Sequence, residues 1–412
     1  MSNRLRSTAV VPVFATLYAL GFTNLFLRSS LGVMAPGLTQ EMALSPAMLS
    51  TVASSFFFAY AIMQLPTGML LDRFGPRRTL ATMLLFTTAG AALFSMARTP
   101  DMLIAGRILM GIGCAGTFTG GFYVLNAWLP PERVVTQIGA VNSFSALGTL
   151  CAATPFAIMI AWIGWRESYW IFTGGVAALT LAMALVMRDV PPGKAPSPAK
   201  SESLRNVFAG VREAARQPDM WRLLVVGLPM SAASTIVGSW GAPYLADVHG
   251  LDSIGRGNVL LGVGACSIAG HFFYGYVARW LNSIKAVVIG GSMLITIALG
   301  LIAAIEQPPL WLIGALFCAI GLFSAYPTLA HAHTRGLVPA HLVGRGVSVT
   351  NLGIMTAIAS AQLAFGWIVG LFPAATGVPP AVAYRAAFAM LSLIALVAII
   401  IYAPIRDTKP RG

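Results

Sequence analysis

The chain has 412 residues, of which 57% are hydrophobic and 9% are charged, whereas a soluble domain carries about 25% charged residues. This composition excludes an ordinary soluble enzyme and indicates a protein that crosses a membrane many times. The net charge of +13 does not indicate binding of nucleic acid, because no basic stretch forms a continuous soluble face.

Twelve apolar segments are long enough to cross a membrane as helices. We expect them at about 11–34, 46–70, 78–97, 101–127, 137–160, 168–187, 220–246, 256–279, 284–304, 309–332, 345–371 and 382–402. With the N-terminus in the cytoplasm, the cytoplasmic segments hold 20 of the 26 lysines and arginines. This bias predicts the orientation and places both termini inside.

The first predicted helix follows Arg4 and Arg6 and remains apolar as far as Met34. That run is too long for the hydrophobic part of a signal peptide, so we interpret it as an uncleaved membrane helix. Asn24 and Arg28 lie inside it. A charged residue within a membrane segment is a candidate functional residue.

The predicted loop between the second and third helices, residues 68–80, concentrates four charges in a short turn. They are Asp72, Arg73, Arg77 and Arg78. These charges predict that the turn lies in water between two membrane helices. Gly68 allows two helices to approach closely, and Gly75-Pro76 favours a tight turn.

This loop resembles the loop between helices two and three of the major facilitator superfamily, which reads Gly-x-x-x-Asp-Arg-x-Gly-x-Arg-Arg. The matching residues are Gly68, Asp72, Arg73, Gly75, Arg77 and Arg78. The resemblance implies an all-α integral membrane fold, with twelve transmembrane helices in two pseudo-symmetric six-helix bundles that rock about a central site. It also implies that, while the cavity faces outward, Asp72 braces the cytoplasmic side against the helix that begins near Arg345, with Glu132 as a partner for the loop arginines.

The first helix is similar to that of the superfamily's organic-anion branch, in which an arginine precedes a short apolar stretch and a proline. The matching residues are Arg28, Val33, Ala35 and Pro36, whereas the family's acid just before the arginine is absent. The resemblance implies that Arg28 binds the anionic group of a substrate. The alternative is an arginine that reaches outward to the lipid head groups.

The fourth helix resembles the superfamily pattern in which an arginine is followed by glycines after four and six residues, here Arg107, Gly111 and Gly113. Arg28 and Arg107 each lie about six residues from the outer end of their helix, which is roughly 9 Å below the surface. Two cations at one depth, on helices that line the cavity in this fold, predict an anion site. For Arg107 the alternative is a structural bond to helix carbonyls.

All thirteen acidic residues fall in predicted loops or at helix ends. No membrane carboxylate is therefore left to neutralise Arg28 or Arg107, and a bound anion would supply the missing charge. The usual carboxylate for proton coupling is missing for the same reason. His271 and His331 are candidates for a proton relay because histidine titrates near neutral pH, although packed histidines would look the same in the sequence.

Further polar and aromatic side chains inside the predicted helices are candidate substrate contacts, and each of them could equally be a packing residue. They are Asn24, Tyr60, Gln64, Tyr123, Asn142, Trp240, Tyr326 and Asn351. Trp240 is also a candidate outer gate, because Trp240-Gly-Ala-Pro243 interrupts the seventh helix near its outer end. The four cysteines form no Cys-x-x-Cys pair, so we expect packing residues and neither a metal nor another cofactor.

The two halves of the chain look like a diverged repeat with an offset near 208 residues. Gly68 and Arg78 are spaced like Gly275 and Lys285, although the second copy of the loop has lost its acid. We therefore expect an N-terminal six-helix bundle at 1–188, a cytoplasmic linker at 189–219 and a C-terminal six-helix bundle at 220–412. Within the linker, an amphipathic stretch around Leu204–Ala215 predicts one short surface helix.

The sequence thus predicts a secondary active transporter of a small organic anion, bearing a carboxylate or phosphate, in a bacterial cytoplasmic membrane. We expect a monomer that works in uptake, by exchange, proton symport or facilitated diffusion. A carrier of a neutral or zwitterionic nutrient is the main alternative. A drug or metabolite exporter is less well supported, because helix five lacks the Gly-Pro pattern of drug antiporters. A transporter-like sensor lacks a signalling domain, and an enzyme lacks a converging nucleophile and base.

Overall fold

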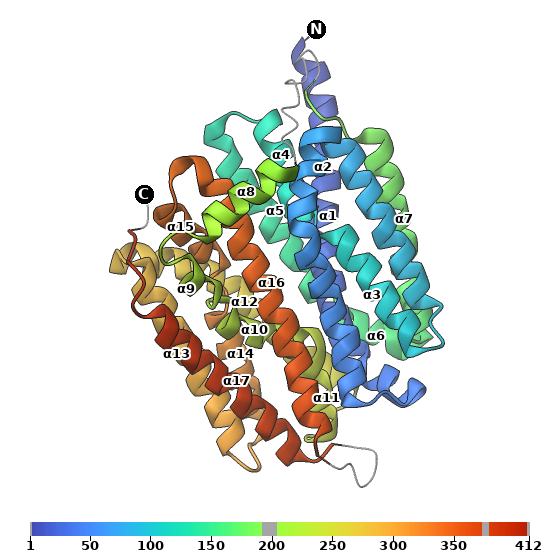
Figure 1. Cartoon of the computed structure of the whole chain (residues 1–412). Helices are drawn as coiled ribbons and strands as arrows, with labels where there is room; N and C mark the ends of the chain where they lie inside the picture. The colour runs from blue at the N-terminus through green and yellow to red at the C-terminus, as the bar shows by residue number, and fades with distance from the viewer. Residues whose placement is uncertain (1, 192–203, 373–378, 410–412) are drawn as a thin grey trace.

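The computed structural model describes residues 2–191, 204–372 and 379–409. The described residues form helices joined by short connections, and the long helices run side by side along one axis (Figure 1). We call the first group the N-terminal set: α1 (Ser2–Met42), α2 (Pro46–Ser95), α3 (Pro100–Cys114), α4 (Thr117–Trp128), α5 (Pro131–Cys151), α6 (Thr154–Ile163) and α7 (Trp165–Val186). The short α8 (Leu204–Ala215) follows it.

The second group, which we call the C-terminal set, contains two short irregular turns as well as helices. Its elements are α9 (Met220–Leu224), α10 (Gly227–Thr235), the π-helical turn η1 (Ile236–Trp240), α11 (Gly241–Asp247), α12 (Ser253–Leu281), α13 (Ile284–Ala304), α14 (Leu310–Phe323), α15 (Pro327–Leu337), the 3-10 turn η2 (Ala340–Leu342), α16 (Val343–Gly370) and α17 (Ala381–Tyr402). The larger buried apolar cluster contains residues of both sets, and a second cluster lies within the N-terminal set.

Ten helical segments among the described residues are long and apolar enough to cross a membrane, and α14 is a shorter apolar helix. The 50-residue α2 contains both the second and the third predicted segments. Dividing α2 and adding α14 accounts for the twelve segments expected from the sequence. The prediction of an all-α, multi-pass membrane protein is confirmed.

The predicted turn at Gly75-Pro76 is a sharp kink within α2. Gly75 has φ 76° and ψ 164°, a conformation that a side chain would strain, so glycine is needed here. Thr79 Oγ1 donates to Leu70 O at 2.9 Å across the kink. The N–H of Arg77 donates to Asp189 Oδ1 at 2.7 Å, so this carboxylate caps the restarted helix.

Four of the predicted membrane helices are broken in mid-course. The interruptions are Ala115–Gly116, Ala152–Ala153, Val225–Val226 and Ser324–Tyr326. Pro155 and Pro327 stand in the first turn of the helices that follow two of these breaks, where a missing N–H is tolerated. A break leaves main-chain groups without helix partners, so at membrane depth it must be enclosed by protein or line a cavity.

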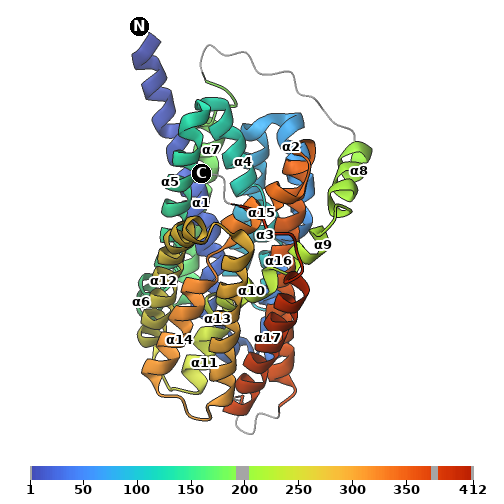
Figure 2. The same ribbon diagram turned by 90° about the vertical axis from the view of Figure 1, so that its left-hand side faces the viewer.

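The predicted surface helix is confirmed as α8, with the expected bounds. It lies at the same end of the molecule as the N-terminus, outside the long helices (Figure 1, Figure 2). Gly210 and Ala214, one turn apart, are buried and face inward. We call this end, which also carries the Gly75 kink, the linker side, and the opposite end the far side.

Candidate functional site

The two sets pack tightly against each other on the far side. A Cβ added to Gly32 of α1 would lie 2.2 Å from Val237 O, and one added to Gly366 of α16 would lie 1.8 Å from Ser50 Oγ of α2. Thr154 Oγ1 of α6 donates to Asn258 Oδ1 of α12 at 2.9 Å. No side chain fits at these glycines without moving a backbone or a neighbour, so the far side is closed.

The linker side is packed more loosely along the same helices. Added Cβ atoms on Gly68, Gly139, Gly275 and Gly344 would meet nothing within 4 Å. These glycines come from α2 and α5 of one set and from α12 and α16 of the other. Of these four, Gly68 and Gly344 come from different sets and line the same cavity, so the sets are separated there.

A cavity of about 160 Å³ lies between the sets on the linker side. Its lining comes from α2, α4, α8 and α16 and includes Gln64, Gly68, Asp72, Thr119, Val211, Arg345 and Ser348. The loop acid, the start of α16 and the linker helix thus share one cavity. The cavity brings Asp72 and Arg345 together, and the expected brace between them in the outward-facing state stays a prediction.

Arg345 lies directly on α8. A Cβ on Gly210 would be 2.0 Å from Arg345 Nη1 and 2.3 Å from its Cζ, so the guanidinium occupies the space above this glycine. His341 and Glu213 form a second contact between α8 and the start of α16, at 3.4 Å. The linker helix is therefore attached to the C-terminal set while its Val211 faces the cavity.

The remaining charges of the loop point away from this cavity or bind main chain. Arg77 donates to Ala184 O at 2.6 and 2.9 Å. Arg73 and Arg78 are exposed, and Arg73 lies 5.3 Å from the ring of Phe74. The side chain of Glu132 lies outside the described residues, so its role as a partner stays a prediction.

Arg28 is half-buried in α1 and faces α2 and the break in the fourth predicted helix. Its guanidinium lies 5.2 Å from the centre of the Phe57 ring. It also interacts electrostatically with the hydroxyl of Tyr60 and the thiol of Cys114, neither of which is charged in its usual form. Within the described ranges, no ion pair neutralises Arg28.

Arg107 lies one layer deeper, inside the N-terminal set, and is 1% exposed. Its Nη1 donates to Leu27 O at 2.8 Å, and its guanidinium stands 4.6 Å from the centre of the Phe56 ring. Among the described residues, its Nε and Nη2 have no hydrogen-bond partner. The bond to a helix carbonyl is the structural role that the sequence analysis gave as the alternative to anion binding for Arg107. The two unpartnered nitrogen atoms of its guanidinium remain available to another acceptor.

Asn24 and Gln64 bind the carbonyls that the break between α3 and α4 leaves free. Asn24 Nδ2 donates to Cys114 O at 2.9 Å and to Thr117 Oγ1 at 3.0 Å, and Gln64 Nε2 donates to Ala115 O at 3.3 Å. Two predicted substrate contacts thus hold the broken helix beside Arg28. Asn24 Oδ1 is buried and has no hydrogen-bond partner in the part of the chain that the structure describes.

Other predicted contacts do not gather at Arg28. Tyr326 Oη lies 3.0 Å from Ser292 Oγ inside the C-terminal set, and Trp240 is buried at the closed far side against Phe365. Tyr123 and Asn142 are exposed, and Asn351 is half-buried in α16. The structure therefore concentrates the candidate anion site on α1, α2 and the α3–α4 break.

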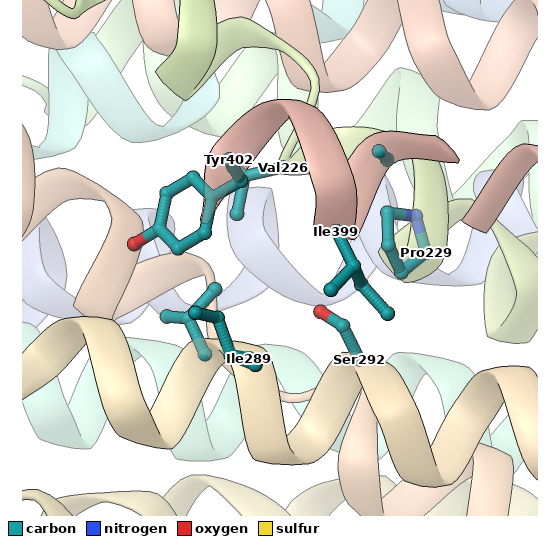
Figure 3. A pocket seen from close by; sticks show the side chains of 8 residues that line it. Val226, Pro229, Ile289, Ser292, Ile399 and Tyr402 are labelled. Atoms are coloured by element: carbon teal, nitrogen blue, oxygen red, sulfur yellow. The ribbon is translucent and has the colours of Figure 1, made fainter. Parts of the chain in front are cut away.

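A second, smaller pocket lies within the C-terminal set, between α10, α13 and α17 (Figure 3). Val226, Pro229, Ile289 and Ile399 line it together with Ser292 and Tyr402. Its volume of about 10 Å³ is close to that of one water probe, so it cannot hold an organic substrate.

The two histidines of the expected proton relay lie on separate helices, α12 and α15. His271 is exposed, with Nδ1 2.8 Å from Ser267 O, whereas His331 is half-buried and its Nε2 has no partner. In the part of the chain that the structure describes, no hydrogen bond connects them. A relay through both stays a prediction.

Sequence reasoning missed Asp189 and Gly210. Asp189 caps the restarted α2 from 112 residues away, and Gly210 makes room for Arg345. Neither partner is close in the chain, so only the fold reveals these contacts. The C-terminal set shows a similar contact: Asp407, which follows its last helix, accepts the N–H of Lys285 at 3.0 Å.

The sequence profile of the Major Facilitator Superfamily matches residues 17–355. A probable L-galactonate transporter of Escherichia coli is 27% identical over 353 residues, which cover 83% of this chain and 72% of that protein. The probable galactarate/D-glucarate transporter GudP of the same organism is 23% identical, over 90% and 89% of the two chains. The probable sulfoacetate transporter SauU of Cupriavidus necator is 26% identical, and the match spans only 60% of its length.

Solved structures share the fold. A bacterial homologue of the human lysosomal transporter Spinster, in an inward-facing and unoccupied conformation, superposes with a TM-score of 0.77 at 18% identity, over 98% of this chain and 97% of that one. The inward-open xylose transporter XylE of Escherichia coli gives a TM-score of 0.73 at 12% identity, over 97% of both chains. At these identities the likeness establishes the architecture and not the substrate.

Proposed function

Because this chain belongs to the Major Facilitator Superfamily and is a multi-pass membrane transporter, we propose that it carries a small organic anion, with Arg28 binding the anionic group. Arg107, behind Arg28, contributes positive charge from inside the N-terminal set. The similarity to probable transporters of L-galactonate, galactarate/D-glucarate and sulfoacetate supports an anionic substrate of modest size.

The observation that carries this proposal is the charge imbalance around the two arginines. Both lie among apolar and uncharged side chains, and no carboxylate of the described residues pairs with either. An arginine at membrane depth costs about 3 kcal/mol even on the most favourable scale. An anionic substrate offsets this cost when it binds, so the substrate acts as the counter-ion.

The packing difference between the two ends supports a cycle of alternating access. The far side is tight at Gly32 and Gly366, while the linker side contains the cavity beside Asp72. We propose that the linker side is cytoplasmic, as the lysine and arginine bias predicts, and that this arrangement is the inward-facing state. Substrate release into the cytoplasm then completes uptake.

The same proposal assigns residues 1–188 and 220–412 to the two rocking bundles and 189–219 to the linker between them. It places the protein in a bacterial cytoplasmic membrane as a monomer, with both termini inside. It leaves His331, whose Nε2 has no partner, as the candidate for coupling protons to transport.

A ligand screen by thermal unfolding of the detergent-purified protein tests the proposal. D-galactonate, D-glucarate, sulfoacetate, neutral sugars and cationic drugs are each added to the wild type, to Arg28→Ala and to Arg107→Ala. A ligand at 100 times its dissociation constant adds about 2.7 kcal/mol of stability, which is readily measured. We expect one class of anion to stabilise the wild type and to have no effect on Arg28→Ala.

Arg98→Ala is the matched control, because Arg98 is exposed in the connection between α2 and α3. It should respond to ligands like the wild type. If neutral sugars or cationic drugs stabilise the wild type and Arg28→Ala equally, Arg28 is structural and the proposed substrate class is wrong.

A further inference from the structure

Two cysteines from separate helices lie side by side in the C-terminal set. Cys266 of α12 and Cys318 of α14 interact through a hydrogen bond between their side chains. A Cβ added to Gly262, which lies one helical turn before Cys266 on the same face of α12, would be 3.4 Å from Cys318 Sγ. The two thiols therefore meet across the contact between the helices, although no Cys-x-x-Cys motif in the sequence predicts the pair.

Small residues bring the backbones of α12 and α14 together on either side of this pair. A Cβ added to Gly321 would lie 2.6 Å from Val263 O, and one added to Gly270 would lie 2.3 Å from a carbonyl oxygen of α14. Ser267, the neighbour of Cys266, donates through Oγ to Gly321 O at 3.1 Å. A disulfide requires Cα atoms about 4.4–6.8 Å apart, which two helices reach only where their backbones nearly touch. The two helices are in such close contact at this level.

The surroundings of the pair are apolar and partly open. Both cysteines are half-buried, so neither residue is sealed in the core. The exposed residues beside them on the same helices are Ala265, Ala269 and Ala315. The helix α12 is long and apolar enough to cross a membrane, and α14 is a shorter apolar helix. A molecule that reacts here has to enter an apolar environment, which favours an uncharged reactant over a charged one.

We propose that Cys266 and Cys318 are a redox-active dithiol that closes into a disulfide by exchange with an apolar disulfide compound. One cysteine loses its proton and attacks a sulfur of the compound, which forms a mixed disulfide and releases one thiol. The other cysteine then attacks the protein sulfur of the mixed disulfide, which joins α12 to α14 and releases a second thiol. The two cysteine protons end on the two released thiols, and the electrons lost by the cysteines reduce the compound.

The disulfide would fix α14 to α12 shortly before the break at Ser324–Tyr326. Tyr274 of α12 already donates to Phe323 O at 2.6 Å at this break. Oxidation thus adds a covalent bond to a junction that hydrogen bonds and packing otherwise hold, and it also constrains the unfolded chain. The oxidised protein should therefore unfold at a higher temperature than the reduced protein. This site is separate from the proposed anion site, so either proposal can fail without the other.

The test treats the reduced, detergent-purified protein with excess dipyridyl disulfide and identifies the products on each cysteine by mass spectrometry. We expect Cys266 and Cys318 to be linked to each other without an attached pyridyl group, because the neighbouring thiol displaces the second pyridinethione before more reagent arrives. Dithiothreitol should restore both thiols. In Cys266→Ala the remaining Cys318 should keep one pyridyl group. Cys151, a half-buried cysteine of α5, is the internal control and should also keep one.

The melting temperature provides a second measurement. Oxidised wild type should melt at least about 2 °C above the reduced protein, whereas Cys266→Ala treated in the same way should show no such rise. Pyridyl groups retained on both Cys266 and Cys318 would overturn the proposal, because the thiols would then not reach each other. No reaction at either cysteine, a disulfide between two copies of the chain in place of the internal one, or no rise in melting temperature would overturn it as well.

Discussion

The two sets of helices differ in the charge that they bury. The N-terminal set encloses two arginines, and Arg107 keeps two unpaired nitrogen atoms there. The C-terminal set encloses rings whose polar atoms are mostly bound: Tyr384 Oη donates to Asp247 at 2.5 Å, and His333 lies 2.7 Å from Tyr402 Oη and 2.8 Å from Arg406 O. Positive charge without a counter-ion is thus confined to one set.

This difference shows that the two related bundles of a pseudo-symmetric carrier need not contribute the same charge to its centre. A fold made of two related bundles places equivalent helices around one centre, but only one bundle supplies the charge. In the described part of the other bundle, the buried amide oxygen of Gln362 has no hydrogen-bond partner. Three predictions test this division. They concern the surface where the two sets meet, the charged loop that only one set has, and the capping carboxylates that both sets share.

The largest of these three effects is expected at Gly32, where the two sets are in close contact. A methyl group in Gly32→Ala would lie 2.2 Å from Val237 O, so the backbones of α1 and η1 must separate. Overpacking of this kind typically costs about 1–3 kcal/mol, which shifts the equilibrium between states about 5- to 150-fold against far-side closure. We expect uptake to fall at least about tenfold.

Gly37→Ala is a matched control on the same helix, because a Cβ there would meet nothing within 4 Å. A cysteine placed at Ser50, which lies on the same surface, should react faster with a membrane-impermeant maleimide in the Gly32→Ala background. Unchanged labelling together with normal uptake would contradict the claim that this surface closes the far side.

A moderate effect is expected at Asp72, which has no acidic counterpart in the repeated loop of the C-terminal set. Asp72 lines the linker-side cavity with Arg345 and does not line the region around Arg28. Asp72→Asn should therefore reduce turnover about tenfold while the substrate dissociation constant stays nearly unchanged. Asp101→Asn, at the opposite end of the molecule, is the control. If Asp72→Asn turns over substrate at the wild-type rate, the loop has no role in gating.

The smallest effect concerns a feature that both sets share. Asp189 accepts the N–H of Arg77 and Asp407 accepts the N–H of Lys285, so each set ends with a carboxylate that caps one of its own helices. Replacement of either by alanine should lower the free energy of unfolding by about 1 kcal/mol, measured by thermal denaturation. If the two alanine variants lose very different amounts of unfolding free energy, the two caps are not equivalent.

The cap at Asp407 also predicts a dependence on pH. Burial alone would raise the pKa of Asp407, but hydrogen bonds from Ser283 and from the backbone of Lys285 and Thr408 outweigh it and lower the pKa. The stabilisation is therefore complete above the ordinary pKa of 3.8 and is lost as the pH falls through the lowered value. Asp407→Ala should lose less stability relative to the wild type in strong acid than at neutral pH.

The sequence was sufficient for the membrane segments and for α8, because apolar length and amphipathic spacing are local properties. It was not sufficient for the helix breaks. Ala115–Gly116 contains no proline, and the break there depends on Asn24 and Gln64, which bind the freed carbonyls from 51 or more residues away. Contacts over such separations depend on how the helices pack.

The candidate site was predictable in its charge and not in its geometry. The sequence alone showed that no predicted membrane helix contains a carboxylate that could neutralise Arg28 or Arg107. The sequence could not show that Arg107 would bind Leu27 O while Arg28 faced Tyr60, because both arginines sit at the same depth. Rotation of a helix about its axis decides between these environments, and it is fixed by packing.

Counterflow of D-galactonate and of sulfoacetate into proteoliposomes tests the central claim most directly. The wild type, Arg28→Gln and the control Arg98→Gln are loaded with unlabelled anion, and entry of labelled anion is followed. We predict rapid exchange of at least one of the two anions by the wild type and by Arg98→Gln, and a loss of about hundredfold in Arg28→Gln, because a charge-assisted hydrogen bond is removed. Exchange by Arg28→Gln at the wild-type rate would contradict the role of Arg28 as the site of anion recognition.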